Sequence, residues 1–326
     1  MEQLTVRVAR KYRDAADIAV FELEDVAQLP LPPFSAGAHI DVHVAPGLVR
    51  QYSLCNDPAE QHRYVIGVLR DKDTRGGSGA LHDKVQENDL IRIGAPRNLF
   101  PLAAAEHSLL LAGGIGITPL LCMAEHLHRA GAGFALHYCS RSAAHAAFRE
   151  RIAAAPWAQH AHFHFDDGDS RQRFELAGLL ADSPRHTHVY TCGPGGFIDH
   201  VVSTAADFGW DPQQVHHEYF GRVASKENDG TNTQADGDQA FDVRIASSGR
   251  IIHVAADIPV SSALAQHGVC IPVSCEQGVC GSCVTRVLEG EPDHRDLLFS
   301  DAQRAANDQF TPCCSRSRSK MLVLDL

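Results

Sequence analysis

Three cysteines on one short segment could bind a metal cluster. Their spacing is C-x4-C-x2-C, and they occupy positions Cys275, Cys280 and Cys283. A vicinal pair, Cys313 and Cys314, lies farther along the chain. Three thiolates on one loop, with a fourth from a distant segment, form the ligand pattern of a [2Fe–2S] cluster. Gly278 and Gly281 fit such a loop, because a backbone that wraps a cluster needs positive φ angles and N–H groups close to the sulfurs.

Two other interpretations of these cysteines are a structural zinc site and a disulfide framework. Zinc sites usually combine paired C-x2–4-C units, often with histidine, and the triple spacing does not match them. A disulfide framework is typical of secreted chains, and the N-terminal segment 1–5 has neither the basic nor the apolar part of a signal peptide. The spacing therefore favours the iron–sulfur cluster over both.

The composition is that of a globular protein with room for two or three domains. The chain has 326 residues, of which 44% are hydrophobic and 21% are charged. Its net charge of −11 argues against nucleic acid and against an anionic membrane surface as partners, because both attract basic surfaces. The apolar run 109–124 is broken by glycines and a proline and is too short to span a bilayer. Ten cysteines without a signal peptide indicate a reducing compartment, so we expect the protein in the cytoplasm.

The first hundred residues predict a small antiparallel barrel. Short alternating or β-branched segments are typical of strands, and turns with proline or glycine separate them. These segments are 4–8, 19–23, 40–44 and 64–69.

Two segments of this barrel could bind a flat, phosphorylated ligand. In 50–54, Arg-Gln-Tyr-Ser-Leu, an arginine, a tyrosine and a hydroxyl follow one another along a strand. In 75–79, Arg-Gly-Gly-Ser-Gly, a glycine-rich turn leads into a helix start, whose free N–H groups suit a phosphate. Each segment alone also fits an ordinary strand or turn.

After residue 102 the pattern changes to strands that alternate with helices, which predicts a parallel sheet with crossover helices. Two glycine-containing turns, 113–119 and 192–197, follow predicted strands at their carboxyl ends, where open α/β sheets bind ligands. Thr118 and Pro119 are typical of an N-cap and a first helical residue. The G-x-G-x-x-G dinucleotide motif is met only loosely.

Taken together, these segments resemble a known family. Arg-x-Tyr-Ser-Leu, Gly-Gly-Ser, Gly-Gly-Ile-Gly-Ile-Thr-Pro and Cys-Gly-Pro-Gly are similar to signatures of the ferredoxin–NADP reductase superfamily. The resemblance is to its FMN-containing branch, the phthalate dioxygenase reductase and vanillate O-demethylase reductase family. The C-terminal order of hairpin, helix, cluster loop and final strand resembles the β-grasp of plant-type ferredoxins.

The resemblance implies a flavin site on the barrel. The strand 50–53 would contact the isoalloxazine and ribityl parts, and 76–78 would hold the single phosphate, with Arg70 or Arg75 nearby. A second phosphate loop for the adenylate half of FAD is not visible, which favours FMN. The residues expected to bind the flavin are Arg50, Gln51, Tyr52, Ser53, Val68, Leu69, Arg70, Gly76, Gly77, Ser78, Gly79 and Phe220.

The resemblance also implies a nicotinamide site, with Ser53, Thr118 and Cys192 at the point of hydride transfer. The residues expected to bind the dinucleotide are Gly113, Gly114, Gly116, Thr118, Arg141, Cys192, Gly193 and Pro194. An acidic residue beside the adenosine ribose would favour NADH by repelling a 2′-phosphate, and the turn 140–142 contains none. The family is mostly NADH-dependent, so NADH is expected and NADPH stays open.

The expected fold is multidomain, α/β plus all-β. Residues 1–102 would form the FMN barrel, 103–224 a Rossmann-like α/β domain, 225–239 a polar linker and 240–326 a ferredoxin domain. The segment 310–316 resembles the Cys-x-Ser-Arg end of ferredoxins fused to reductases. That resemblance makes Cys313 the fourth ligand and places Cys314 at the variable position, although the choice between the two stays open.

These expectations combine into an electron-transfer reductase. NADH would deliver two electrons as a hydride to FMN, and the [2Fe–2S] cluster would pass them singly to a terminal oxygenase, expected to be of Rieske type. One alternative is a reductase for a diiron or cytochrome P450 monooxygenase. Another, from a different class, is a non-catalytic redox relay or sensor, which the intact glycine turns do not favour.

Overall fold

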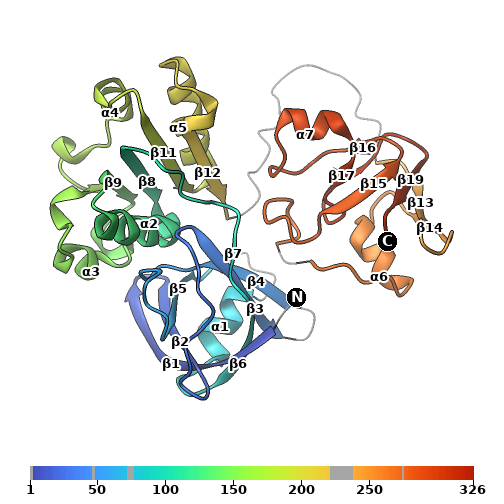
Figure 1. Cartoon of the computed structure of the whole chain (residues 1–326), viewed down its shortest axis with the longest axis horizontal. Helices are drawn as coiled ribbons and strands as arrows, with labels where there is room; N and C mark the ends of the chain where they lie inside the picture. The colour runs from blue at the N-terminus through green and yellow to red at the C-terminus, as the bar shows by residue number, and fades with distance from the viewer. Residues whose placement is uncertain (1–2, 46–47, 72–76, 221–237, 274) are drawn as a thin grey trace. The chain divides into compact units, whose positions relative to one another are not determined.

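The computed structural model describes the chain except for residues 1–2, 46–47, 72–76, 221–237 and 274 (Figure 1). The chain divides into two compact units, Met1–Phe220 and Gly221–Leu326. The predicted boundary at 102/103 falls inside the first unit. The boundaries of the three predicted domains stay a prediction.

The N-terminal part of the first unit is an antiparallel barrel with one helix. Its described strands follow the order β4-β3-β6-β1-β2-β5, with β7 paired to β3, and a bridge between Leu54 and Ile66 joins the two ends. Inward-facing side chains such as Phe21, Leu23 and Ile40 are fully buried and form the core. The elements are β1 Gln3–Ala15, β2 Ile18–Asp25, β3 Ala38–Ala45, β4 Leu48–Ser53, β5 Tyr64–Leu69, α1 Gly77–Lys84, β6 Leu90–Gly94 and β7 Arg97–Asn98.

The rest of the first unit is a parallel sheet with helices on both faces. The strand order is β10-β9-β8-β11-β12, and every described pairing in it is parallel. Its elements are β8 His107–Gly113, α2 Ile117–Ala130, β9 Gly133–Ser140, α3 Arg149–Ala154, β10 Ala161–Phe165, α4 Leu176–Asp182, β11 Thr187–Gly193, α5 Gly195–Asp207 and β12 Val215–Tyr219. Short 3₁₀ turns are η1 Gly114–Gly116, η2 Ala143–His145, η3 Ala158–His160, η4 Ser170–Gln172 and η5 Pro212–Gln214.

The second unit is a mixed sheet that holds the cysteine loop. Its strands follow the order β14-β13-β19-β15-β17, in which β13 and β19 are parallel, and a separate ladder joins β16 to β18. Phe241, Val243, Leu264 and Leu324 belong to its core. The elements are β13 Phe241–Ile245, β14 Ile251–Val254, α6 Val260–Gln266, β15 Thr285–Glu289, β16 Pro292–Asp293, α7 Asp301–Ala306, β17 Gln309–Phe310, β18 Arg316–Ser317 and β19 Met321–Leu324. Barrel, parallel sheet and β-grasp-like sheet confirm the predicted fold class.

The start of α2 corrects one local prediction. The helix begins at Ile117 and Gly116 occupies the N-cap position, so Thr118 is not the N-cap and Pro119 is not the first helical residue. The turn η1 precedes the helix directly, and the Thr118 hydroxyl donates to the Ile115 carbonyl at 3.1 Å. The 3₁₀ turn continues into the helix and leaves Thr118 inside the first turn.

The predicted linker lies mostly outside the described residues. Its last two residues are described and are attached to the second unit: Asp238 pairs with Arg295 at 2.7 Å, and the Gln239 carbonyl accepts from Arg316 at 3.1 Å. These two linker residues therefore contact the second unit.

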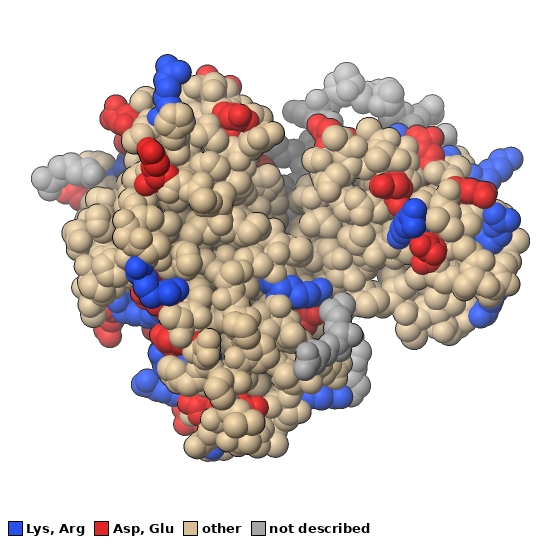
Figure 2. All heavy atoms as spheres, viewed as in Figure 1, with Lys and Arg blue, Asp and Glu red and all other residues tan. Residues whose placement is uncertain are grey.

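Charged side chains are interspersed on the face of the molecule shown in Figure 2, where Lys and Arg alternate with Asp and Glu. Among the described helices, none is both long and apolar enough to cross a membrane.

Candidate functional site

The two barrel segments predicted to bind the flavin lie against each other. A Cβ built on Gly77 would lie 2.6 Å from Cγ and 2.8 Å from Nε of Arg50, so the Arg50 side chain covers the first residue of α1. A cation beside the N–H groups at a helix start forms a site for a phosphate or another anion. Only glycine at position 77 leaves room for this arrangement.

The other predicted flavin residues surround this position or lie outside the described chain. The Ser78 hydroxyl accepts from the Asp71 N–H at 3.1 Å, and Arg70 forms a two-pronged ion pair with Asp83 at 2.7 and 2.9 Å. Gln51 donates to Asp41 at 3.1 Å. Among the remaining predicted residues, Val68 is buried, Tyr52 and Gly79 are half-buried, and Leu69 and Phe220 are exposed. Gly76 lies outside the described residues.

The two glycine turns of the parallel sheet pack backbone against backbone. A Cβ on Gly116 would lie 2.1 Å from the Cys192 carbonyl oxygen, and one on Gly193 would lie 2.9 Å from the Gly113 Cα. A Cβ on Gly113 would lie 2.9 Å from Pro194 Cδ, whereas one on Gly114 would meet nothing within 4 Å. The turns after β8 and β11 therefore form one closely packed surface at the carboxyl edge of the sheet, the place where open α/β sheets bind ligands.

Thr118 links this surface to the barrel. A Cβ on Gly67 of β5 would lie 3.0 Å from Thr118 Cγ2, so the side chain packs directly on a barrel strand. Thr118 is 1% exposed. A ligand that bridges barrel and sheet would reach across this contact.

Ser53, Cys192 and Glu218 meet where β4 ends beside β11 and β12. Cys192 and Glu218 are register partners on adjacent strands, and Ser53 is within hydrogen-bonding reach of the Glu218 carboxyl. Burial raises the pKa of Glu218 to about 8, although the Ser53 hydroxyl favours the charged form. Burial first, and then the nearby Glu218, raise the pKa of the Cys192 thiol, which therefore stays protonated at neutral pH.

Glu218 was not among the predicted site residues. Its Oε2 is shielded from solvent and has no hydrogen-bond partner within the described part of the chain. A buried carboxyl with an unsatisfied oxygen and a perturbed pKa is typical of a functional position. Its place at the carboxyl end of a parallel strand was the signal that could have identified it.

Two further missed residues lie beside the turn that should contact the adenosine ribose. The Asp166 N–H donates to the Ser140 carbonyl at 3.1 Å, and the Asp167 N–H donates to the Arg141 carbonyl at 3.3 Å. Both aspartates and Arg141 are exposed. The turn after β9 contains no acid, but the end of the neighbouring strand β10 supplies two.

The four predicted cluster ligands gather on one side of the second unit. The Cys313 thiol is within hydrogen-bonding reach of Cys275 and Cys283, and Cys280 is within reach of Cys275. Cys280, Cys283 and Cys313 are between 3% and 6% exposed.

The loop backbone fits a group that must be enclosed closely. Glu276, Gly278 and Gly281 have φ angles of 56°, 74° and 67°, and the Gln277 N–H donates to Cys275 Sγ at 3.3 Å. Within the described ranges, no three His, Cys, Asp or Glu side chains are arranged to hold one metal ion. A two-iron cluster places two thiolates on each iron, so four neighbouring thiols fit it better than a single ion.

Family models match one segment in each of the two units. Residues 243–318 match the 2Fe-2S iron-sulfur cluster binding domain, and residues 96–215 match the N-terminal domain of dimethylamine monooxygenase subunit DmmA-like proteins. Fold, thiol loop and sheet-edge surface together define the class of protein, an electron-transfer oxidoreductase.

Full-length relatives identify the family. Vanillate O-demethylase oxidoreductase of Pseudomonas sp. (strain HR199 / DSM 7063) is 52% identical over 297 residues, which are 91% of each chain. The structure of phthalate dioxygenase reductase, described as modular for electron transfer from pyridine nucleotides to [2Fe–2S], has a TM-score of 0.74. It is 40% identical, over 99% of this chain and 98% of that one. The chain belongs to this family of vanillate O-demethylase oxidoreductases and phthalate dioxygenase reductases.

A third similarity extends beyond the family. An intact type IV self-sufficient cytochrome P450 monooxygenase matches with a TM-score of 0.84 and 36% identity, over 99% of this chain and 41% of that chain. Family membership confirms the predicted oxidoreductase class and its cofactor set of FMN, pyridine nucleotide and [2Fe–2S] cluster. The residue-level assignments stay predictions.

Proposed function

We propose that this chain is the reductase component of a Rieske-type aromatic oxygenase or O-demethylase system, with NADH as the electron donor. The observation that carries the proposal is that the sheet-edge surface and the four-thiol loop occur together in this one chain. When bound, FMN accepts a hydride and the [2Fe–2S] cluster passes electrons singly. The chain's own residues hold these groups in place and exclude water.

In the first unit, Arg50 and the start of α1 would bind the FMN phosphate. The packed turns at Gly116 and Gly193 would bind the pyrophosphate of NADH. Both assignments rest on close approaches at which a Cβ would clash, at a helix start in the first case and at the carboxyl edge of the parallel sheet in the second.

At the proposed point of hydride transfer, Ser53, Cys192 and Glu218 would orient the nicotinamide against the flavin. Below pH 8 the Glu218 carboxyl and the Cys192 thiol are both protonated, so the site adds no negative charge beside the reacting ring. A neutral carboxyl can also donate a hydrogen bond to a carboxamide oxygen of the nicotinamide.

The preference for NADH would come from Asp166 and Asp167. Their backbone contacts with Ser140 and Arg141 hold two carboxylates beside the expected ribose position. A 2′-phosphate there would be repelled, which offsets the attraction of the Arg141 guanidinium.

In the second unit, Cys275, Cys280, Cys283 and Cys313 would ligate the cluster. The fourth position goes to Cys313 because its thiol contacts Cys275 and Cys283. Cys314 instead has Cys313, Thr311 and Ser315 within hydrogen-bonding reach.

The test is an anaerobic NADH titration of the purified protein, followed in the visible spectrum, with analysis of the flavin released on heating. We expect flavin and iron–sulfur bands that both bleach with NADH, and FMN in the supernatant. Flavin without iron would contradict the cluster assignment, and a protein that stays colourless after reconstitution would contradict the reductase itself. Released FAD would contradict the FMN assignment.

A second candidate function is supply of electrons to a cytochrome P450, which the similarity to the self-sufficient P450 favours. Coupled assays separate the two: the reductase with NADH is added either to a purified Rieske-type O-demethylase oxygenase with vanillate, or to a P450 haem domain with its substrate. Product from the first pair alone supports the proposal, and product from the second pair alone overturns it. A non-catalytic relay would show neither product nor NADH-dependent reduction of cytochrome c.

A further inference from the structure

A buried carboxyl group packs against the cluster loop without being one of the proposed ligands. A Cβ built on Gly278 would lie 2.9 Å from the Cα and 3.0 Å from the Cβ of Asp296. The next residue, Leu297, donates its N–H to the Gly278 carbonyl at 3.1 Å. Because Gly278 lies between the proposed ligands Cys275 and Cys280, these two residues touch the segment that would wrap the cluster.

The Asp296 side chain is shielded from water and held in one orientation. It is 0% exposed. Its Oδ2 accepts from the Leu298 N–H at 3.1 Å and from the Phe299 N–H at 2.8 Å. Two backbone donors to one oxygen fix the carboxylate in place beside the loop.

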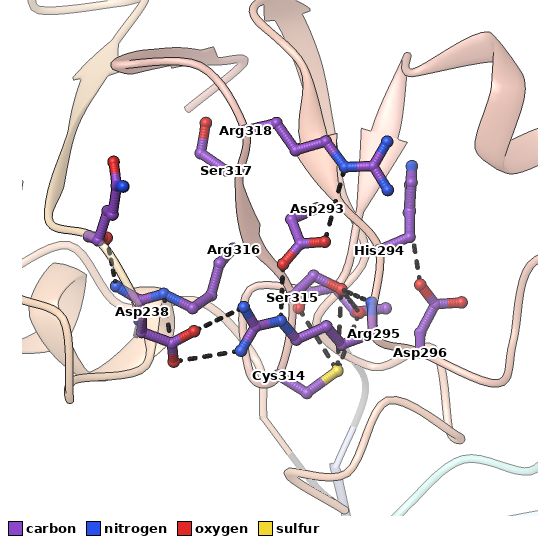
Figure 3. A network of polar contacts seen from close by, with 12 residues as sticks. Asp238, Asp293, His294, Arg295, Asp296, Cys314, Ser315, Arg316, Ser317 and Arg318 are labelled. Carbon is purple, nitrogen blue, oxygen red and sulfur yellow. Dashed lines mark hydrogen bonds and ion pairs between the residues drawn. The ribbon is translucent and has the colours of Figure 1, made fainter. Parts of the chain in front are cut away.

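Within the described chain, no cation is hydrogen-bonded to this carboxylate. Its Oδ1 is buried without a hydrogen-bond partner, and the Nδ1 of His294, 3.4 Å away, also has none there. Arg304 donates at 2.7 Å to the Asp296 backbone carbonyl. Figure 3 shows His294 and Asp296 at one side of the polar network, apart from the ion pair between Arg295 and Asp238.

We propose that Asp296 keeps a buried negative charge beside the cluster and thereby lowers the reduction potential of the cluster. Reduction adds an electron to a group that four thiolates already surround, and a nearby negative charge makes this addition less favourable. The carboxylate is buried, so water and salt screen it little. A lower potential makes the cluster a stronger donor to the oxygenase. This inference rests on the proposed function, because it requires a cluster at the four cysteines.

The experiment is an anaerobic redox titration of the full-length holoprotein, monitored by the EPR signal of the reduced cluster. Asp296→Asn removes the charge but keeps a side-chain oxygen that can accept from Leu298 and Phe299. The variant should keep its iron and favour the reduced cluster roughly tenfold more than the wild type, a rise of about 59 mV for one electron. The rise should persist at high salt. If Asp296 only shaped the turn, the potential would not change.

Two further sites separate a local charge from the net charge. Glu289→Gln removes one negative charge from a side chain that is 70% exposed, and it should leave the potential unchanged. Leu297 is exposed on the segment that bonds to Gly278. Leu297→Lys should raise the potential and Leu297→Glu should lower it. Both shifts should be smaller than that of Asp296→Asn and should shrink at high salt, because an exposed charge is screened.

An unchanged or lower potential in Asp296→Asn would overturn the inference. So would a rise in Glu289→Gln as large as that in Asp296→Asn, because net charge would then be the cause. If Asp296→Asn does not fold or does not retain its cluster, the two Leu297 variants decide, and equal potentials in both reject the inference. A wild-type protein without iron would instead reject the proposed function on which the inference depends.

Discussion

The cluster loop and the Ser53–Cys192–Glu218 site are built in opposite ways. The cluster loop takes three of its four proposed ligands from one short segment, and positive φ angles at Glu276, Gly278 and Gly281 shape that segment locally. The other site combines the ends of three strands from two sheets. One site is formed by local backbone conformation and the other by tertiary packing.

The two regions also treat polar groups differently. Behind the cluster loop, Arg295, Ser315, Thr311 and Cys314 form a continuous hydrogen-bond chain. At the other site, one oxygen of Glu218 is buried without a partner among the described residues. The contrast is one of degree, because His294 and Asp296 beside the cluster loop also have buried polar atoms without a hydrogen-bond partner among the described residues.

The largest expected effect comes from changing a ligand of the cluster loop. Cys280→Ser should lower the rate of electron delivery to cytochrome c or an oxygenase by at least roughly 100-fold, because the proposed cluster loses a ligand. Reduction of the flavin by NADH, measured by stopped flow, should stay within about twofold of the wild type, since the first unit is a separate compact body. Full-rate delivery by the variant would show that the cluster is not on the electron path. The exposed Cys270→Ser is the control.

Gly116→Ala tests the packed glycine turns. The new Cβ would lie 2.1 Å from a backbone oxygen, which cannot move without shifting β11. We expect destabilisation by about 3 kcal/mol. A turn displaced by about 1 Å should also slow flavin reduction by roughly 100-fold. Urea unfolding and stopped-flow reduction measure the two effects.

Gly178→Ala in α4 is the matched control for this substitution. Its Cβ would meet nothing within 4 Å, and the residue is exposed on a helix. It should stabilise the protein by ~0.5–1 kcal/mol and leave flavin reduction unchanged. Equal losses of stability and of flavin-reduction rate in both variants would show that the close approach at Gly116 is not the cause.

The contrast between the two regions also explains what the sequence could predict. Three of the proposed cluster cysteines follow one another at a short fixed spacing, so the sequence pattern alone was enough to predict them as ligands. The strand and helix alternation similarly predicted the parallel sheet, because its hydrophobic periodicity is local. Thr118 was misplaced as an N-cap because the 3₁₀ turn 114–116 runs on into α2, and the sequence carries no signal for that continuity.

Glu218, Asp166 and Asp167 escaped prediction for a different reason. Their partners lie on or directly after other strands, namely Ser53, Ser140 and Arg141. The pairing of β9 with β10 and the packing between two sheets bring these residues together. An acid at the carboxyl end of a parallel strand is a usable signal, but its neighbours follow from the strand order. That order is decided by tertiary packing.

The variant Glu218→Gln tests the buried carboxyl through the pH dependence of the free energy of unfolding. The carboxyl has a pKa of about 8 in the native state against an ordinary value of 4.5, so the folded chain binds more protons than the unfolded chain between these pH values. Native stability should therefore fall as pH rises from about 4.5 to 8, by up to ~1.4 kcal/mol per pH unit, and level off above. Urea unfolding of the holoprotein at pH 5, 6, 7 and 8 should show a shallower fall for Glu218→Gln. The exposed Glu150→Gln should keep the wild-type slope, and an unchanged slope in Glu218→Gln would contradict the buried, protonated carboxyl.

The smallest expected effect concerns the choice of dinucleotide. The double variant Asp166→Asn/Asp167→Asn removes two carboxylates beside Arg141 and leaves the backbone bonds that place the turn. We expect kcat/KM for NADPH to rise roughly tenfold, equivalent to about 1.4 kcal/mol of relieved repulsion, while the value for NADH changes little. Steady-state reduction of cytochrome c with each dinucleotide measures both.

Removal of one carboxylate at the other edge of the sheet separates a local effect from a general one. Asp207 ends α5, which runs away from the carboxyl edge of the strands, so Asp207→Asn alters the net charge far from the expected ribose. Its NADPH/NADH ratio should equal that of the wild type, because exposed charges more than a Debye length apart are screened. If Asp207→Asn raises NADPH use as much as the double variant, net charge rather than the pair beside Arg141 sets the preference. If neither variant raises NADPH use, the adenosine ribose does not lie beside Arg141, and the proposed role of Asp166 and Asp167 is wrong.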